Sequence, residues 1–179
     1  MSNKGLYHSA GWCALLFVVL TVVAYLLQVQ AGELNTPAAI LIVVGTLLFL
    51  PVFYALSVVY RSESSILSLL GLILVVPPVA LTIASIIDDE SVFLYAVSGL
   101  VLAFPVLVFF CLAYRSAKMP RGLVWLKLLA GVFLLMAGAF SFGGATDPQA
   151  WISTISAVVF WVWMVWLWRW FRSDKPTLA

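Results

Sequence analysis

Charged side chains are scarce in this sequence, and their scarcity excludes a water-soluble fold. Only 9% of the 179 residues are Asp, Glu, Lys or Arg, whereas soluble domains carry about 25%. Hydrophobic residues make up 65% of the chain. A soluble domain of this length could not cover so much apolar surface with polar atoms. We therefore expect hydrocarbon to surround most of the molecule.

Residues that carry catalytic or metal chemistry are also few. His8 is the single histidine, and Cys13 and Cys111 are the two cysteines. Haem ligation by paired histidines and a closed metal site both need more ligands than these residues offer. The sequence contains no Gly-rich phosphate loop, nucleophile elbow or Cys-x-x-Cys motif. We expect a protein that is not an enzyme, without catalytic or metal-binding residues, in which both cysteines are ordinary thiols. The sequence names no cofactor.

Long apolar runs are abundant. A membrane-spanning helix needs about 20 apolar residues, whereas strands of a membrane barrel would show alternating segments of about 10 residues. Six continuous runs meet the requirement for a helix, and they cover Gly11–Gln30, Pro37–Tyr60, Ser65–Ile87, Val92–Tyr114, Leu123–Phe142 and Ile152–Trp170. The first run is longer than the apolar part of a signal peptide, about 7–15 residues, so we expect it to be retained. The predicted fold class is all-α, a polytopic membrane protein with one six-helix transmembrane domain over residues 1–179.

The distribution of charge predicts the orientation of these helices. With six spans, both termini and the second and fourth loops lie on one side of the membrane. That side holds every basic residue, namely Lys4, Arg61, Arg115, Lys118, Arg121, Lys127, Arg169, Arg172 and Lys175. The other side holds Glu33, Asp88, Asp89, Glu90 and Asp147 and no basic residue. The positive-inside rule makes the basic side cytoplasmic, so we expect an inner-membrane protein with cytoplasmic termini and no nucleic-acid partner.

A recurring stretch suggests internal repetition. The sequence "PVFYALSVVYRS" at 51–62 returns as "PVLVFFCLAYRS" at 105–116, and Phe171-Arg172-Ser173 echoes its end. One interpretation is three tandem helical hairpins, which would be parallel repeats about an axis along the membrane normal. The alternative is convergence, because an aromatic residue followed by Arg suits any cytoplasmic helix end.

Prolines lie in the middle of three spans. Pro51, Pro77, Pro78 and Pro105 each remove an amide donor and clash with the preceding turn, so each is expected to kink its helix. Such irregular backbone is tolerated where protein buries it or where water lines it. One interpretation is a ligand-binding cavity near the midplane, flanked by five hydroxyl residues, Thr46, Ser57, Thr82, Ser85 and Ser98. The favoured alternative is ordinary packing, since Pro, Gly, Ser and Thr all occur at contacts between membrane helices.

Tryptophan is concentrated in the last span. Trp163, Trp166 and Trp170 recur at helical spacing, so we expect them to share one face. They either anchor the helix at the membrane interface or bind an apolar cofactor or partner, and the anchoring interpretation is favoured. Lys127 is the single ionisable residue that lies within a span, about one turn from its start, and we expect its long side chain to reach the interface rather than to act on a substrate or proton.

Two stretches resemble a known family. The sequence "KMPRGLVWL" at 118–126, followed by Gly131-Val132, and "GTLLFLPVFYAL" at 45–56 are similar to segments of a bacterial domain-of-unknown-function family of multi-helix membrane proteins. The resemblance implies an inner-membrane helical bundle, and it implies no activity or site residues.

The function predicted from these observations is not enzymatic. We expect an accessory or scaffold subunit whose partners are the lipid bilayer and other membrane subunits or an apolar ligand. The alternative is a small carrier or channel that uses a midplane cavity at the proline-kinked helices. Candidate ligand-binding residues are Trp163, Trp166, Trp170, Pro51, Pro77, Pro78 and Pro105.

Overall fold

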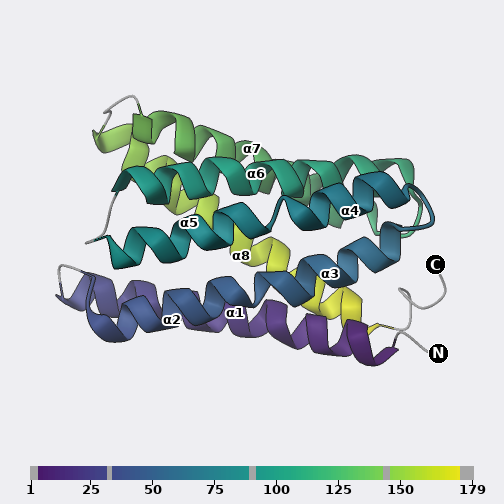
Figure 1. The fold of residues 1–179 in the computed structure, drawn as a ribbon, viewed down its shortest axis with the longest axis horizontal. Helices are drawn as coiled ribbons and strands as arrows, with labels where there is room; N and C mark the ends of the chain where they lie inside the picture. Colours follow the sequence, from purple (N-terminus) through teal and green to yellow (C-terminus); the bar gives the residue numbers. More distant parts are fainter. Residues whose placement is uncertain (1–3, 32–33, 89–91, 143–145, 174–179) are drawn as a thin grey trace.

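Six apolar segments fold into helices that lie side by side along one long axis (Figure 1). A computed structural model describes residues 4–31, 34–88, 92–142 and 146–173. The helices are α1 (Lys4–Ala31), α2 (Thr36–Leu47), α3 (Phe49–Tyr60), α4 (Ser65–Ile73), α5 (Val76–Ile87), α6 (Val92–Arg115), α7 (Arg121–Phe142) and α8 (Thr146–Arg172). These eight helices make six segments that are long and apolar enough to cross a membrane, because α2 and α3 together form one span and α4 and α5 form another. The predicted all-α polytopic fold is confirmed.

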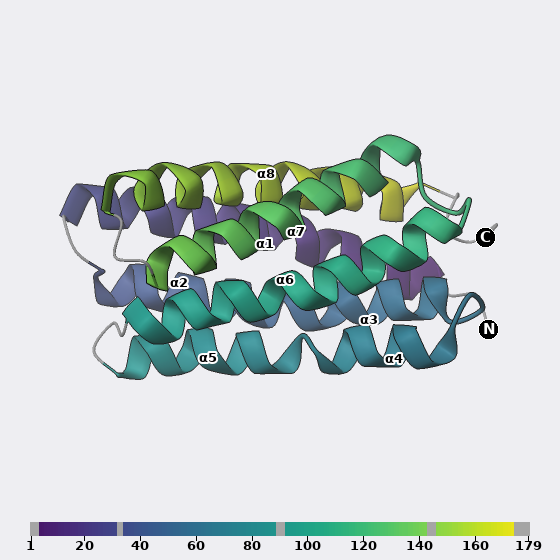
Figure 2. The same cartoon turned by 90° about the horizontal axis from the view of Figure 1, so that it is seen from above.

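The spans close into a bundle in which neighbours in sequence are neighbours in space. α1 packs against α2, α3 and α8, whereas α6 packs against α4 and α5 on one side and α7 on the other. The contact of α1 with α8 brings the first and last spans together, and the start of α1 and the end of α8 lie at the same end of the bundle (Figures 1 and 2). We call this end the basic end, because α1 begins there with Lys4 and α8 finishes there with Arg172. Each predicted hairpin therefore has its two spans in contact, and the proposed duplication stays a prediction.

The helix starts follow local chemistry. The side chain of Asn35 accepts a hydrogen bond from the Ala38 amide at 2.9 Å, and Pro37 occupies the first turn of α2, where its missing amide proton is not needed. Ser64 caps α4 in the same way through the amide of Leu67 at 3.3 Å. These caps replace some of the hydrogen bonds that the first turn of any helix lacks.

The prolines interrupt two of the three spans in which the sequence predicts kinks. The second span breaks at Leu48, three residues before Pro51, and the third breaks at Leu74 and Val75, before Pro77. By contrast, α6 continues as one helix through Pro105. Because α4, α5 and α7 flank α6 on both sides, their packing holds its backbone in place despite the lost amide donor.

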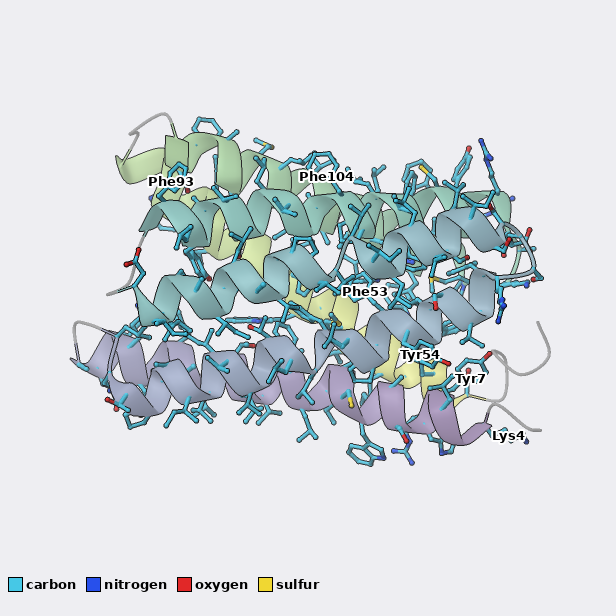
Figure 3. The ribbon with its side chains drawn as sticks, viewed as in Figure 1. Lys4, Tyr7, Phe53, Tyr54, Phe93 and Phe104 are labelled. Atoms are coloured by element: carbon cyan, nitrogen blue, oxygen red, sulfur yellow. The ribbon has the colours of Figure 1, made fainter. Side chains whose placement is uncertain are left out.

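The outer surface of the bundle is hydrophobic along its length. Large apolar side chains such as Ile66, Ile87 and Phe93 are 78%, 78% and 63% exposed, whereas Phe53 is fully buried. In Figure 3, Phe93 and Phe104 project from the outside of the bundle and Phe53 lies between the helices. A surface of this kind suits hydrocarbon rather than water, and this protein is therefore a multi-pass membrane protein.

Candidate functional site: a cavity lined by hydroxyl groups

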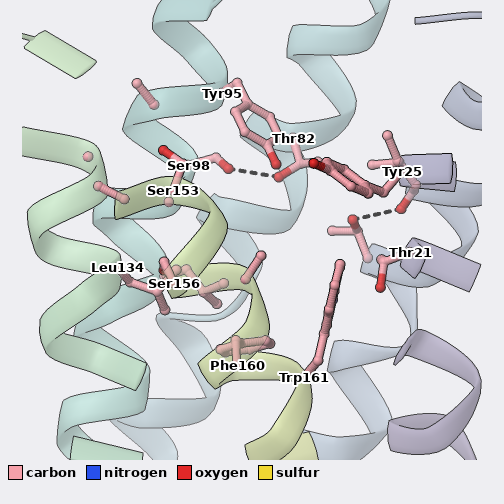
Figure 4. A pocket seen from close by; sticks show the side chains of 18 of the residues that line it. Thr21, Tyr25, Thr82, Tyr95, Ser98, Leu134, Ser153, Ser156, Phe160 and Trp161 are labelled. Carbon is pink, nitrogen blue, oxygen red and sulfur yellow. Dashed lines mark hydrogen bonds between the residues drawn. The ribbon is translucent and has the colours of Figure 1, made fainter. Parts of the chain in front are cut away.

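A cavity of about 330 Å³ lies between the helices in the half of the bundle away from the basic end. Its walls come from the second half of α1 and α7, the first half of α6 and α8, and parts of α2, α3 and α5 (Figure 4). The polar residues that line it are Thr21, Tyr25, Gln28, Thr46, Thr82, Tyr95, Ser98, Ser141, Ser153 and Ser156. None of the described residues that line it carries a charge. A volume of this size is at the lower end of the range for small-molecule sites, about 300–1,000 Å³.

Three aromatic rings form the floor of the cavity on the side of the basic end. The ring centroid of Phe17 lies 4.6 Å from that of Phe49 and 5.8 Å from that of Phe160. Phe49 and Phe160 are 5.6 Å apart in an edge-to-face arrangement, which aromatic pairs prefer. We call these residues the aromatic floor. Beyond it the rings of Phe53 and Trp163 continue the packed core, so the cavity does not extend through the bundle.

A pair of hydroxyl groups joins α5 to α6 at the cavity wall. The Oγ atoms of Thr82 and Ser98 are 2.8 Å apart, and Thr82 also donates to the carbonyl of Pro78 at 2.9 Å (Figure 4). Because Thr82 has a single hydroxyl proton, Ser98 is the donor between them. Both protons are therefore used within the protein, and the free lone pairs at this wall can accept a hydrogen bond from a ligand.

Two further threonines around the cavity follow the same pattern, and one serine differs. Thr21 donates to the carbonyl of Phe17 at 2.8 Å, and Thr46 donates to that of Ile42 at 2.7 Å. Such bonds to the preceding helical turn leave the hydroxyl oxygen available as an acceptor. Ser156 differs, because its buried hydroxyl has no hydrogen-bond partner among the described residues. The wall thus combines several hydroxyl acceptors with the buried Ser156 hydroxyl, which lacks a partner among the described residues.

Two glycines on the cavity wall have opposite surroundings. A side chain added at Gly99 would meet no atom within 4 Å, so Gly99 borders open space. A Cβ atom at Gly138 would lie 3.1 Å from Cα and 3.2 Å from the backbone nitrogen of Leu100. Gly138 therefore allows α7 to approach the backbone of α6 closely, which is a common use of glycine between membrane helices.

None of the seven ligand-binding candidates from the sequence lines this cavity. Trp163 and Trp170 are buried, but Trp166 is 42% exposed, so the three do not share a buried face. Trp166 instead contacts Gly122 on α7. Pro51 is half-buried, Pro77 exposed, and Pro78 and Pro105 are buried. Pro78 is connected to the cavity wall through a hydrogen bond, since its carbonyl accepts from the Thr82 hydroxyl.

Part of the cavity was nevertheless predictable. Of the five hydroxyl residues that the sequence places around a cavity, Thr46, Thr82 and Ser98 line it, whereas Ser57 and Ser85 bond within their own helices. Ser57 donates to the carbonyl of Tyr54 and Ser85 to that of Thr82. A second set of lining residues was not predicted from the sequence, namely Tyr25, Tyr95, Phe160 and Trp161. These residues could have been found in the sequence as aromatic or polar side chains in the half of each span that lies near the acidic loops.

The prediction that Lys127 reaches the interface is wrong. Its side chain is fully buried in the other half of the bundle, and its Nζ atom donates to the Phe109 carbonyl at 3.4 Å. The same atom lies 5.4 Å from the ring centroid of Tyr60 and 5.7 Å from that of Trp163. The neighbours of Lys127 on its helix face, Leu123, Val124 and Ala130, are buried as well, so the rotation of α7 turns Lys127 inwards. Among the described residues no carboxylate pairs with it.

Metal and redox chemistry receive no support from the described parts of the chain. No three His, Cys, Asp or Glu residues within those parts gather closely enough to hold a metal ion. Cys13 is half-buried, Cys111 is exposed, and both are free thiols. The acidic stretch that follows Asp88 lies outside the described residues.

No protein-family model, curated protein sequence or solved structure matches this chain. The resemblance to a bacterial membrane-protein family therefore stays a prediction.

Proposed function

We propose that this protein binds an uncharged amphipathic small molecule inside its membrane bundle. The observation that carries the proposal is the cavity of about 330 Å³, whose described lining is uncharged and combines aromatic rings with hydroxyl acceptors. A ligand that matches this lining has an apolar body and at least one hydroxyl or N–H donor. The donor would bond to the Thr82–Ser98 pair, and the apolar body would rest on the aromatic floor.

This proposal keeps the ligand-binding form of the function that the sequence predicts. We infer no reaction, because the described cavity walls offer hydroxyl groups without a histidine or carboxylate to act as a base. We also infer that the basic end faces the cytoplasm of the inner membrane, since lysine and arginine favour that side. The cavity would then lie in the half of the bundle near the opposite side of the membrane.

A matched pair of probes tests the proposal. 1-Naphthol and 1-methylnaphthalene have similar size, but only the naphthol can donate a hydrogen bond. Their binding to the protein in phosphatidylcholine nanodiscs is measured by equilibrium dialysis, with empty nanodiscs to subtract partition into lipid. We expect the naphthol to bind about fivefold more tightly, as one net hydrogen bond contributes about 1 kcal/mol.

Two glycine variants form the matched control. Gly99→Leu places a side chain in the cavity and should reduce naphthol binding about tenfold or more, because it fills space that the ligand needs. Gly5→Leu adds the same side chain where nothing lies within 4 Å at the start of α1, far from the cavity, and should leave binding unchanged. Equal binding to both variants would exclude the cavity as the site.

A carrier function is a second candidate, and the helix breaks favour it. The breaks at Leu48 and at Leu74–Val75 lie close to Phe49 of the aromatic floor and to the α5 wall. Interrupted helices in membrane transporters bend around a fixed binding site and so allow access to alternate from one side to the other. Uptake of labelled naphthol derivatives of low permeability into proteoliposomes, compared with uptake by the Gly99→Leu variant, tests this candidate.

A further inference from the structure

The surface where α1 meets the end of α8 contains a second cluster of functional side chains, at the basic end. The guanidinium carbon of Arg172 lies 5.1 Å from the ring centroid of Trp12 and 6.0 Å from that of Trp168. The two indole rings lie 6.2 Å apart. Arg172 is thus held against two aromatic faces, an arrangement that stabilises a cation and fixes its direction.

A shallow, open depression of the surface adjoins this cluster and is lined by Trp168, Arg169, Arg172 and Ser173. Both arginines are exposed, and no carboxylate among the described residues pairs with either. The hydroxyl of Ser173 donates to the Trp170 carbonyl at 2.6 Å, so its proton is already used. The two guanidinium groups are therefore the exposed donors that line this depression.

The depth of this cluster matches the membrane interface. A Cβ atom at Gly11 would lie 3.3 Å from Cβ of Phe171 and 3.4 Å from the Trp168 carbonyl, so α8 ends level with Gly11. The apolar run of the first span also begins at Gly11, whereas residues 4–10 extend α1 beyond it. The last arginines of α8 consequently lie where the hydrocarbon ends and the lipid phosphates begin.

We propose that Trp12, Trp168, Arg169 and Arg172 form a binding site for the headgroup of an anionic phospholipid. Arginine binds phosphate through two parallel hydrogen bonds, and basic pockets of membrane helices select anionic headgroups. The exposed ring of Trp12 lies beside the lipid glycerol and upper acyl chains, at the depth that tryptophan prefers. This site is separate from the hydroxyl-lined cavity, which lies in the other half of the bundle.

Native mass spectrometry of the protein released from mixed nanodiscs of phosphatidylglycerol and phosphatidylcholine tests the proposal. We expect phosphatidylglycerol to be retained about tenfold more than phosphatidylcholine, because the choline ammonium offsets the phosphate charge that the arginines attract, whereas a glycerol headgroup leaves that charge uncompensated. The double variant R169Q/R172Q should retain both lipids equally. Trp12→Leu removes one ring beneath Arg172 and should reduce the preference about two- to fivefold.

Two controls distinguish this site from the general attraction of anionic lipids to basic residues and from ligand binding in the hydroxyl-lined cavity. Arg61→Gln removes an exposed arginine at the same end that has no tryptophan platform among the described contacts, and it should keep the preference. Gly99→Leu alters only the hydroxyl-lined cavity and should also keep it. Equal retention of the two lipids by the unaltered protein would overturn the proposal, as would an equal loss in Arg61→Gln. Inorganic phosphate at the same concentration as the lipid should not displace phosphatidylglycerol. If it does, the site binds free phosphate, and the lipid proposal is overturned.

Discussion

The Nζ atom of Lys127 lies 5.4 Å from the centroid of the Tyr60 ring, deep inside the bundle. Trp163 and the Phe109 carbonyl complete its surroundings, so aromatic faces and one backbone oxygen take the place of a carboxylate. Aromatic faces attract a cation when water is excluded, but they do not fully replace its lost hydration. This relationship connects α3, α6, α7 and α8 at a single point.

Replacing Lys127 by methionine tests the energetic balance at this point. Lys127→Met keeps a flexible chain of similar length and removes the buried amine, so we expect the free energy of unfolding to rise by about 1 kcal/mol. Lys127→Asp should lower it by about 3 kcal/mol or more, because the shorter side chain leaves a cavity and buries a carboxyl group without a partner. Thermal unfolding in detergent, followed by circular dichroism, measures both changes. A large loss of stability in Lys127→Met would contradict the prediction.

A double-mutant cycle isolates the contact with the ring. Tyr60→Leu should cost about 1–2 kcal/mol more in the original background than in the Lys127→Met background, since only the former loses an amine–ring contact. The hydrogen bond from the Tyr60 hydroxyl to the Met119 sulfur, 3.6 Å long, is lost in both backgrounds and cancels in the cycle. Additive effects of the two substitutions would exclude the coupling.

Glycine substitutions on the cavity wall should separate close packing from open space. Gly138→Ala should lower the free energy of unfolding by about 1–3 kcal/mol, because its Cβ atom would lie 3.1 Å from the Leu100 Cα atom and backbone cannot give way. Gly99→Ala meets nothing within 4 Å and should raise stability by about 0.5–1 kcal/mol through the higher helix propensity of alanine. Chemical unfolding of the two variants side by side is the measurement. Equal effects would show that the approach of α6 and α7 does not depend on Gly138.

The hydroxyl pair of Thr82 and Ser98 should contribute to both folding and ligand choice. Thr82→Val removes the hydroxyl with little change in shape, and Ser98→Ala removes its partner. We expect a coupling free energy of about 0.6 kcal/mol between the two substitutions, the average for hydrogen bonds between membrane helices, and at most about 1.7 kcal/mol. Either variant should also reduce the preference for 1-naphthol over 1-methylnaphthalene. A variant that keeps the full preference would place the ligand's donor elsewhere in the cavity.

Cysteine labelling tests the proposed orientation. In a background with Cys13→Ser and Cys111→Ser, a single cysteine replaces either Ala31, at the end of α1, or Ala117, between α6 and α7, and both positions are exposed. A membrane-impermeant maleimide applied to spheroplasts with an intact inner membrane should label the Ala31→Cys variant only. Permeabilised cells should show labelling of both variants. Labelling of Ala117→Cys in intact spheroplasts would reverse the orientation.

The spans were predictable from the sequence because hydrocarbon imposes a simple length requirement. All six predicted runs correspond to a span, and the boundaries of the third are reproduced at Ser65 and Ile87. The start of α1 differs by seven residues, from Gly11 to Lys4, because Tyr7 stacks on Phe171 at 6.0 Å and extends the helix past the apolar run. Such a contact joins the two ends of the chain, and no local pattern contains it.

The position of the cavity was less predictable for a physical reason. An empty volume depends on how side chains from several helices fit together, whereas sequence patterns report on one helix at a time. Thr46, Thr82 and Ser98 were identified because hydroxyl groups are unusual in apolar spans. Lys127 was misplaced because only its depth was considered. Its direction depends on how α7 packs, and Leu123, Val124 and Ala130 on the same face are buried.

The aromatic floor divides every span that contributes to it into two unequal parts. Towards the basic end, Phe53, Trp163 and Met164 leave little free volume, whereas towards the opposite end the same helices surround a void. The amide protons of a single continuous helix such as α8 should therefore exchange with deuterium at two different rates, slowly after Phe160 and faster before it. The amplitude of thermal motion would then differ along the membrane normal. The lipids of one leaflet would contact a rigid half of the protein, and those of the other leaflet a more mobile half.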